Sequence, residues 1–181
     1  MRNNVKENNR KSIRLKDFDY TTPWWYYVTI CTYEHKYYFG NVNESLVILN
    51  NTGKIAEDCW VKIPEHFNNV ELDCYIFMPN HLHGIIIINK QEEVAAQYIE
   101  PLQIERRYQN IVKGSLGSIV RSYKAAVTRE CTRCKIYDFK WQRNYYERII
   151  RNEKELYNIR RYIEQNPLKW EYEKNISKNL F

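Results

Sequence analysis

The 181-residue sequence has no long apolar run, which excludes several classes of protein. Its longest aliphatic run is Ile85 to Ile88, which has the length of a strand and falls far below the roughly 18 residues of a membrane-spanning helix. The first residues also lack the apolar stretch of a secretory signal. We therefore expect a cytoplasmic protein that does not enter a membrane.

Glycine, proline and cysteine are scarce, with 5 residues of each type. So few glycines and prolines argue against low-complexity linkers, and 44% hydrophobic residues suit one globular domain. In the cytoplasm the cysteines are expected to be reduced thiols. Cys131 and Cys134 form a single C-x-x-C pair, whereas a closed structural zinc site needs four ligands. The sequence also has no P-loop for nucleotide phosphates.

Basic residues gather near the end of the chain. The net charge is +6, made up of +3 in residues 1–33, −7 in residues 34–105 and +10 in residues 106–181. A segregated basic surface is typical of proteins that bind the phosphate backbone of nucleic acid, although solvated helix faces are the alternative. Aromatic residues make up 15% of the chain and could stack on exposed bases. For Trp24, Trp25 and Phe77 we expect core packing instead.

Apolar periodicity predicts an α+β domain with a central antiparallel sheet over residues 20–175, after a basic flexible arm at 1–19. Strands are predicted at 24–32, 70–77 and 81–88, with a fourth within 139–150. Helices are predicted at 54–62, at 111–129 and from Asn152 to Pro167, where the proline should end the helix. Residues 89–110 are expected to form a surface insertion.

Two of the four histidines are candidate metal ligands. His81 and His83 are two residues apart in a predicted strand, so their side chains should emerge on the same face. Two converging imidazoles can hold a divalent cation, whereas two hydrogen-bonded histidines in the core are the alternative. Gly84 follows them, and its missing side chain would let a ligand or a backbone approach. A third ligand would have to come from elsewhere, and the last helix offers candidates.

Three segments, in this order along the chain, resemble one protein family. Residues 78–84 (MPNHLHG) resemble the His-hydrophobic-His motif of the HUH single-strand nucleases, in the form found in IS200-like and REP-associated tyrosine transposases. Residues 141–146 (WQRNYY) with 151–153 (RNE), and residues 162–167 (YIEQNP), resemble the C-terminal signature of the REP-associated branch. The resemblance covers residues 20–170 and implies the ferredoxin-like or RRM-like palm of these enzymes.

The resemblance also implies an activity and its residues. The protein would be a metal-dependent endonuclease and strand transferase for single-stranded DNA at hairpin-flanked sites. Tyr162 would attack the DNA backbone and form a 5′-phosphotyrosine, while His81, His83 and Asn166 would hold Mg²⁺ or Mn²⁺. Gln165 is the alternative to Asn166 as third ligand. Whether the protein is a monomer or a homodimer is left open.

Helix geometry agrees with this assignment of the nucleophile. Residues four apart share a helix face, so one helix can carry both Tyr162 and Asn166 to the histidines. The alternative is that Tyr162 only continues the apolar stripe of Ile159 and Ile163. Tyr157 should face elsewhere, because it lies about 140° away around the helix.

The DNA backbone is expected to contact basic residues of the arm and of the helix at 111–129, namely Arg10, Lys11, Arg14, Lys16, Arg121, Lys124 and Arg129. Two other functions use the same features. A non-catalytic nucleic-acid-binding protein on this fold would not need both histidines and Tyr162. A metal-dependent phosphodiesterase that activates water would leave no covalent protein–DNA adduct.

Overall fold

The computed structural model describes residues 19–90, 112 and 114–179. Its regular elements follow one another as β1 (Trp24–Cys31), a 3-10 turn (Tyr33–His35), β2 (Gly40–Asn43), β3 (Leu46–Leu49), α1 (Asn51–Val61), α2 (Ile63–His66), β4 (Val70–Met78), β5 (His81–Ile88), α3 (Leu116–Arg133), β6 (Tyr146–Ile149) and α4 (Glu153–Asn179). All of the predicted arm except Asp19 and most of the predicted insertion lie outside the described residues.

Four strands form an antiparallel sheet in the order β4-β5-β1-β6, and β2 and β3 form a separate hairpin. The expected α+β fold with a central antiparallel sheet is therefore confirmed. Without the β2–β3 hairpin, the chain runs strand, helices, two strands, helix, strand, which is the βαββαβ pattern of ferredoxin-like folds. In such a fold the connecting helices cover one face of the sheet, and the other face is left for additional elements.

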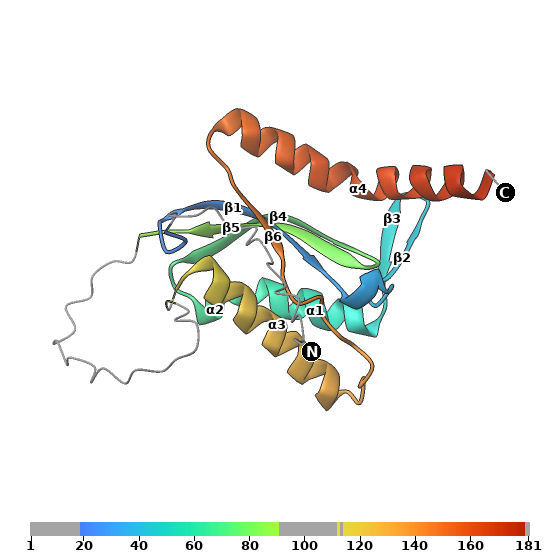
Figure 1. The fold of residues 1–181 in the computed structure, drawn as a ribbon, viewed down its shortest axis with the longest axis horizontal. Helices are drawn as coiled ribbons and strands as arrows, with labels where there is room; N and C mark the ends of the chain where they lie inside the picture. Colours follow the sequence, from blue (N-terminus) through green and yellow to red (C-terminus); the bar gives the residue numbers. More distant parts are fainter. Residues whose placement is uncertain (1–18, 91–111, 113, 180–181) are drawn as a thin grey trace, which may run out of the picture.

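Helices α1, α2 and α3 lie on one face of the sheet, and α4 crosses the other (Figure 1). Because side chains alternate along a strand, β1 contributes Tyr26, Val28 and Ile30 to the core on the α1–α3 side. The intervening Trp25 and Tyr27 pack on the α4 side. Strand β5 is central and almost fully buried on both faces, so every residue after His81 in it is 8% exposed or less.

The prediction that Pro167 ends the last helix is wrong, because α4 continues through this proline to Asn179. An interior proline costs about 3 kcal/mol, and tertiary contacts of the next turns offset that cost. The Glu171 carboxylate accepts hydrogen bonds from Ser45 N at 2.7 Å, from Ser45 Oγ at 2.9 Å and from Glu44 N at 3.1 Å. Glu44 and Ser45 have positive φ in the β2–β3 turn, so Glu171 joins the second half of α4 to this hairpin.

Several other boundaries differ from the sequence-based expectation. The β2–β3 hairpin was not predicted, and the fourth strand covers only Tyr146–Ile149. The preceding residues are irregular, although Phe139 is buried. Trp24 was expected in the core but is 43% exposed, while Phe77 is buried as expected. Within the described residues, no helix has both the length and the apolarity needed to cross a membrane.

Candidate active site

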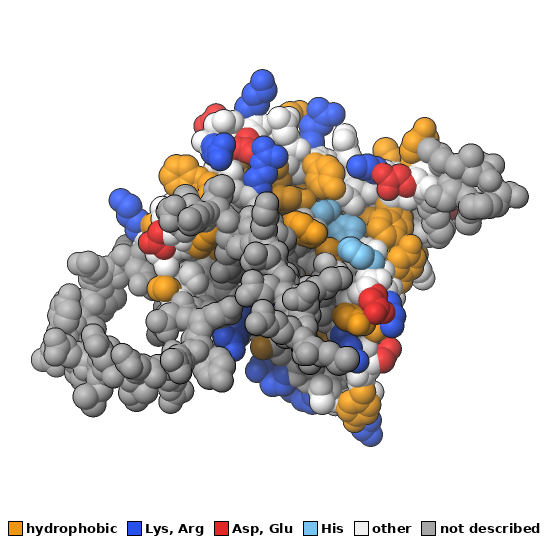
Figure 2. Space-filling view, in the orientation of Figure 1, with side chains coloured by type: hydrophobic (Ala, Val, Ile, Leu, Met, Phe, Trp, Pro, Cys, Tyr) orange, Lys and Arg blue, Asp and Glu red, His pale blue; other side chains and the backbone are white. Residues whose placement is uncertain are grey.

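The two histidines of β5 meet on the face of the sheet that α4 covers. The Nε2 atoms of His81 and His83 are 3.0 Å apart, as expected for side chains two residues apart on one strand. His83 is 5% exposed. Figure 2 shows a group of histidines at the surface, bordered by hydrophobic side chains.

Both imidazoles are neutral at physiological pH. Burial lowers the pKa of His83 to about 3 and that of His81 to about 4, because the charged form loses its hydration. Neighbouring imidazoles, His81 for His83 and His35 for His81, lower each pKa further. A neutral imidazole has a free lone pair, which is the form that binds metal ions.

The position of the proton on His81 follows from its neighbour Asn80. The Asn80 side-chain amide donates from Nδ2 to His35 O at 3.2 Å, so its Oδ1 faces His81 Nδ1 at 2.6 Å. An amide oxygen can only accept, hence His81 donates through Nδ1–H. Its Nε2 is then left with a lone pair directed at His83.

Two hydroxyl groups hold the other nitrogen of His83. Tyr27 Oη lies 2.7 Å and Thr29 Oγ1 2.9 Å from His83 Nδ1. A hydroxyl can donate or accept, so this pair satisfies Nδ1 in either tautomer of the ring. Burial raises the pKa of Tyr27 to about 12, which keeps its hydroxyl protonated.

Tyr162 reaches the histidines from α4. Its ring centroid lies 5.3 Å from that of His83 and 6.4 Å from that of Tyr27, and the side chain is 42% exposed. Lys169 Nζ lies 5.8 Å from the Tyr162 ring centroid. The Tyr162 side chain is therefore both close to the histidine pair and partly open to solvent.

An ion pair anchors this part of α4 to β4. Arg160 donates from Nε to Asp73 Oδ1 at 3.0 Å, and its Nη2 also contacts Asp73 Oδ2. The Arg160 guanidinium holds the pKa of the Asp73 carboxyl below its usual range. The β-bulge between Leu72 and Tyr75 lies at this point of β4. Because Arg160 is only two residues from Tyr162, its ion pair with Asp73 helps to fix the position of the tyrosine.

Asn166 is one turn after Tyr162 on α4 and is 6% exposed. Its side chain makes no hydrogen bond to any residue that the structure describes, and its amide atoms are not among the fully buried polar atoms that lack a partner, so they keep access to solvent. Gln165 is exposed instead and lines a second cavity beyond Tyr162. Asn166 is therefore the more buried of the two candidate ligands, and the role of either one as third ligand stays a prediction.

The histidine geometry fits a divalent cation. Two nitrogens at about 2.1 Å from an ion, 90° apart, are about 3.0 Å from each other, which matches the observed separation; the same distance is that of a hydrogen bond between the two rings, the alternative that the sequence left open. The described residues contain no group of three or more His, Cys, Asp and Glu side chains that could hold a metal. Asn166 as the third ligand stays a prediction. Imidazole nitrogens suit transition-metal ions better than Mg²⁺.

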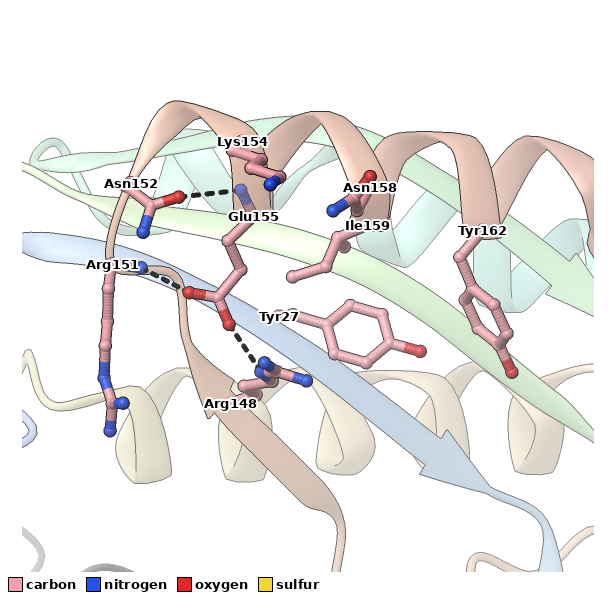
Figure 3. Close-up of a pocket in the computed structure, with 9 residues that line it drawn as sticks. All are labelled: Tyr27, Arg148, Arg151, Asn152, Lys154, Glu155, Asn158, Ile159 and Tyr162. Atoms are coloured by element: carbon pink, nitrogen blue, oxygen red, sulfur yellow. Dashed lines mark hydrogen bonds and ion pairs between the residues drawn. The ribbon is translucent and has the colours of Figure 1, made fainter.

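A cavity of about 720 Å³ opens beside Tyr162 on the amino-terminal side of α4 (Figure 3). We call it the α4 cavity, and it is lined by Tyr27, Arg148, Arg151, Asn152, Lys154, Glu155, Asn158, Ile159 and Tyr162. Asn152 caps α4 as predicted, because its Oδ1 accepts from Glu155 N at 2.9 Å. The Glu155 carboxylate accepts from Arg148 Nε at 2.6 Å and from Arg151 N at 2.9 Å.

The predicted basic helix does not share this site. Helix α3, with Arg121, Lys124 and Arg129, lies on the face of the sheet opposite α4 (Figure 1). Lys124 Nζ donates to the backbone oxygens of Gln142 and Asn144, and burial lowers its pKa to about 8. Arg10, Lys11, Arg14 and Lys16 lie outside the described residues. The DNA contacts of all these residues stay predictions.

Gly84 does not open the site to a ligand, contrary to expectation. It follows His83 on β5, so it faces the α1–α3 side, where an added Cβ would lie 2.5 Å from Trp60 Cζ2. The missing side chain makes room for the indole ring. Alternation along the strand separates the two roles, since the histidines use one face and the glycine the other.

The chain resembles one sequence relative over almost its full length. An uncharacterized protein of Haemophilus influenzae is 42% identical over 172 residues, covering 93% of both chains. The two proteins belong to one family. No protein-family model matches the chain.

Two solved structures resemble the fold. A REP-associated tyrosine transposase bound to a REP hairpin superposes with a TM-score of 0.56 at 17% identity, covering 86% of this chain and 73% of the other. The chain therefore has the fold of a REP-associated tyrosine transposase. A Deinococcus radiodurans protein provisionally named a transposase gives a TM-score of 0.44 at 15% identity, covering 84% and 97% of the two chains.

Sequence reasoning missed several residues that surround the two histidines and Tyr162. Tyr27 and Thr29 are two residues apart in a predicted strand, so their shared face was visible, but their pairing with His83 required the β1–β5 register. Trp170 packs 5.9 Å from His81 between ring centroids. It lies beyond Pro167, where the sequence predicted no helix.

Proposed function

We propose that this protein is a metal-dependent endonuclease and strand transferase for single-stranded DNA, with Tyr162 as the nucleophile. The observation that carries the proposal is the approach of Tyr162 to His83, at 5.3 Å between ring centroids, where the two Nε2 atoms converge within 3.0 Å. A protein that only bound DNA would need no such convergence. The fold of a relative that binds a DNA hairpin supports the same substrate class.

Tyr162 would attack the phosphorus of a DNA phosphodiester. The Oη–phosphorus bond forms, the bond from phosphorus to the 3′ oxygen breaks, and the DNA is left as a 5′-phosphotyrosine and a free 3′-hydroxyl. The phenol loses its proton and the departing 3′ oxygen gains one. Attack by a 3′-hydroxyl on the phosphotyrosine reverses these changes, so the strands are rejoined without ATP.

His81, His83 and Asn166 would hold the ion, either Mg²⁺ or Mn²⁺. When bound, such an ion neutralises charge on the phosphate oxygens and lowers the barrier to attack. The two imidazoles bring no negative charge, so the ion keeps its full charge for the DNA. The donor set of two nitrogens and an amide oxygen favours Mn²⁺ over Mg²⁺.

Lys169 is placed to assist the nucleophile. Its ammonium lies 5.8 Å from the Tyr162 ring centroid, so this flexible side chain could reach a phosphate bound beside the tyrosine. Its ion pair with Glu173, at 3.8 Å, is exposed and therefore weak. Lys169 can therefore move toward that phosphate when substrate arrives.

The test is covalent capture of labelled single-stranded hairpin DNA in the presence of Mn²⁺, read on a denaturing gel. Wild type should form an adduct, Tyr162→Phe should form none, and Tyr157→Phe should retain it, because Tyr157 is a 60%-exposed tyrosine elsewhere on α4. An adduct mapped to another tyrosine would refute the assignment. Cleavage that persists in Tyr162→Phe without an adduct would favour the phosphodiesterase that uses activated water.

A further inference from the structure

The α4 cavity is lined by more cationic side chains than carboxylates. Its lining has three cations, Arg148, Arg151 and Lys154, and one carboxylate, Glu155. The carboxylate is already engaged with Arg148 Nε and with the backbone N–H of Arg151. The charge of Arg151 also acts on Glu155, but neither its guanidinium nor the ammonium of Lys154 has an ion pair or hydrogen bond with any residue in the described part of the chain. The cavity is therefore suited to an anion.

Apolar and aromatic surface forms the other end of the same cavity. Figure 3 shows Arg151 and Lys154 toward the beginning of α4, and Tyr27 and Tyr162 side by side at the opposite end. Ile159 completes the apolar wall between them. Cations beside aromatic rings match a single nucleic-acid strand, in which phosphates alternate with bases that can stack. The volume of about 720 Å³ lies in the range of sites for small ligands and is too small for a duplex.

We propose that the α4 cavity binds the segment of single-stranded DNA next to the phosphate that Tyr162 attacks, with Arg151 and Lys154 contacting its phosphates. This inference rests on the proposed function, because it takes Tyr162 as the point of cleavage. Asn158 stands one turn before Tyr162 and lines the same cavity. Its amide can donate and accept, so it is placed to contact the edge of a base.

The path of the strand follows from the two cavities that Tyr162 separates. The second cavity, of about 570 Å³, is lined by Ser45, Gln165, Leu168, Lys169, Glu171 and Tyr172 beside Tyr162. Its charged residues, Lys169 and Glu171, cancel each other. A strand lying along α4 would therefore find phosphate contacts mainly on the amino-terminal side of Tyr162.

The test measures binding of a labelled single-stranded hairpin oligonucleotide by fluorescence anisotropy, in a Tyr162→Phe parent that cannot cleave it. The variant Arg151→Ala/Lys154→Ala removes two side chains, and the hydrogen bond from the backbone N–H of residue 151 to Glu155 remains. The control Lys54→Ala/Lys62→Ala removes the same charge from exposed positions on the α1 side of the sheet. Folding of each variant is checked by its thermal unfolding midpoint.

Each lost phosphate contact on single-stranded DNA should reduce the slope of log affinity against log salt by about 0.7. The cavity variant should therefore bind roughly tenfold or more weakly at about 50 mM salt and have a slope shallower by about 1.4. The control should bind as the parent does. Unchanged affinity of the cavity variant, or equal weakening of the control, would overturn the inference.

The proposed function and this inference fail separately. One outcome is that wild type forms no adduct, while the cavity variant loses DNA affinity and the control does not. The DNA-binding site then stands and the nuclease proposal falls. If wild type forms the adduct and the cavity variant binds normally, the nuclease proposal stands and the strand takes another path. An Asn158→Ala variant in the same parent should change the preference among base sequences without changing the salt slope, and an altered slope would count against its contact with a base.

Discussion

Two hydroxyl groups, those of Tyr27 and Thr29, contact His83 Nδ1. Removing both should weaken metal binding without changing any proposed metal ligand. His81 donates through Nδ1 to Asn80, so His83 must donate from Nε2 to His81 and accept a hydrogen bond at Nδ1 from a hydroxyl. A metal on His83 Nε2 requires the opposite tautomer, with the proton on Nδ1. The hydroxyls of Tyr27 and Thr29 can accept that proton, because each can reverse its role.

The expected size follows from what each variant leaves behind. In Tyr27→Phe, Thr29 Oγ1 still lies 2.9 Å from Nδ1, so Mn²⁺ affinity should fall by less than about tenfold. In Tyr27→Phe/Thr29→Val the metal-bound form would bury an Nδ1–H without an acceptor, at a cost of roughly 1–3 kcal/mol, and the smaller cost of an Nδ1 lone pair without a donor in the metal-free form offsets part of it. The double variant should therefore lose about 10–100-fold in affinity, more than the two single variants combined.

Isothermal titration calorimetry with Mn²⁺ measures the affinities, with Tyr157→Phe as a control that removes the hydroxyl of an exposed tyrosine on α4. Nitrogen chemical shifts of the imidazole provide a second measurement, because the two tautomers differ at Nδ1 and Nε2. Wild type should change tautomer at His83 on metal addition. If the double variant binds Mn²⁺ as tightly as wild type, or if the His83 tautomer does not change, this reasoning is refuted.

Three other predictions test the site and its support. His81→Ala should lose Mn²⁺ binding in calorimetry and DNA cleavage while keeping most DNA affinity, and cleavage that survives in EDTA would remove the metal from the mechanism. Gly84→Ala should cost about 1–3 kcal/mol by overpacking against Trp60, measured as a lower unfolding midpoint, and Trp60→Phe should relieve part of that loss. Because both site histidines have a pKa lowered to about 3–4 in the folded protein and near 6.5 when unfolded, their contribution to folding stability is complete above pH 6.5 and declines as the pH falls toward 4. A metal-free protein whose denaturant midpoint does not change over that range would contradict their burial as neutral groups.

Local sequence patterns were enough to predict much of the fold. The aromatic run after Pro23 and the two strands around Met78-Pro79-Asn80 were visible, because alternation and turn residues are local properties. The β2–β3 hairpin was missed, since its turn residues Glu44 and Ser45 are not the glycine or asparagine usual at positive φ. Glu171 supports this turn from 126 residues away in the sequence. No local pattern could indicate that contact.

The sequence by itself determined that His81 and His83 share a face, that Asn152 can cap a helix and that Tyr162 and Asn166 lie on one side of it, because strand and helix periods require these relations. Only the tertiary structure decided which partners they meet. The register of β1 on β5 places two hydroxyls on His83, and packing of α4 on the open face of the sheet brings Tyr162 to the histidines. Packing on the β2–β3 hairpin also carries α4 past Pro167, against its local preference. These contacts join segments that are far apart in the chain, so their geometry depends on the packing of the whole core and on no local pattern.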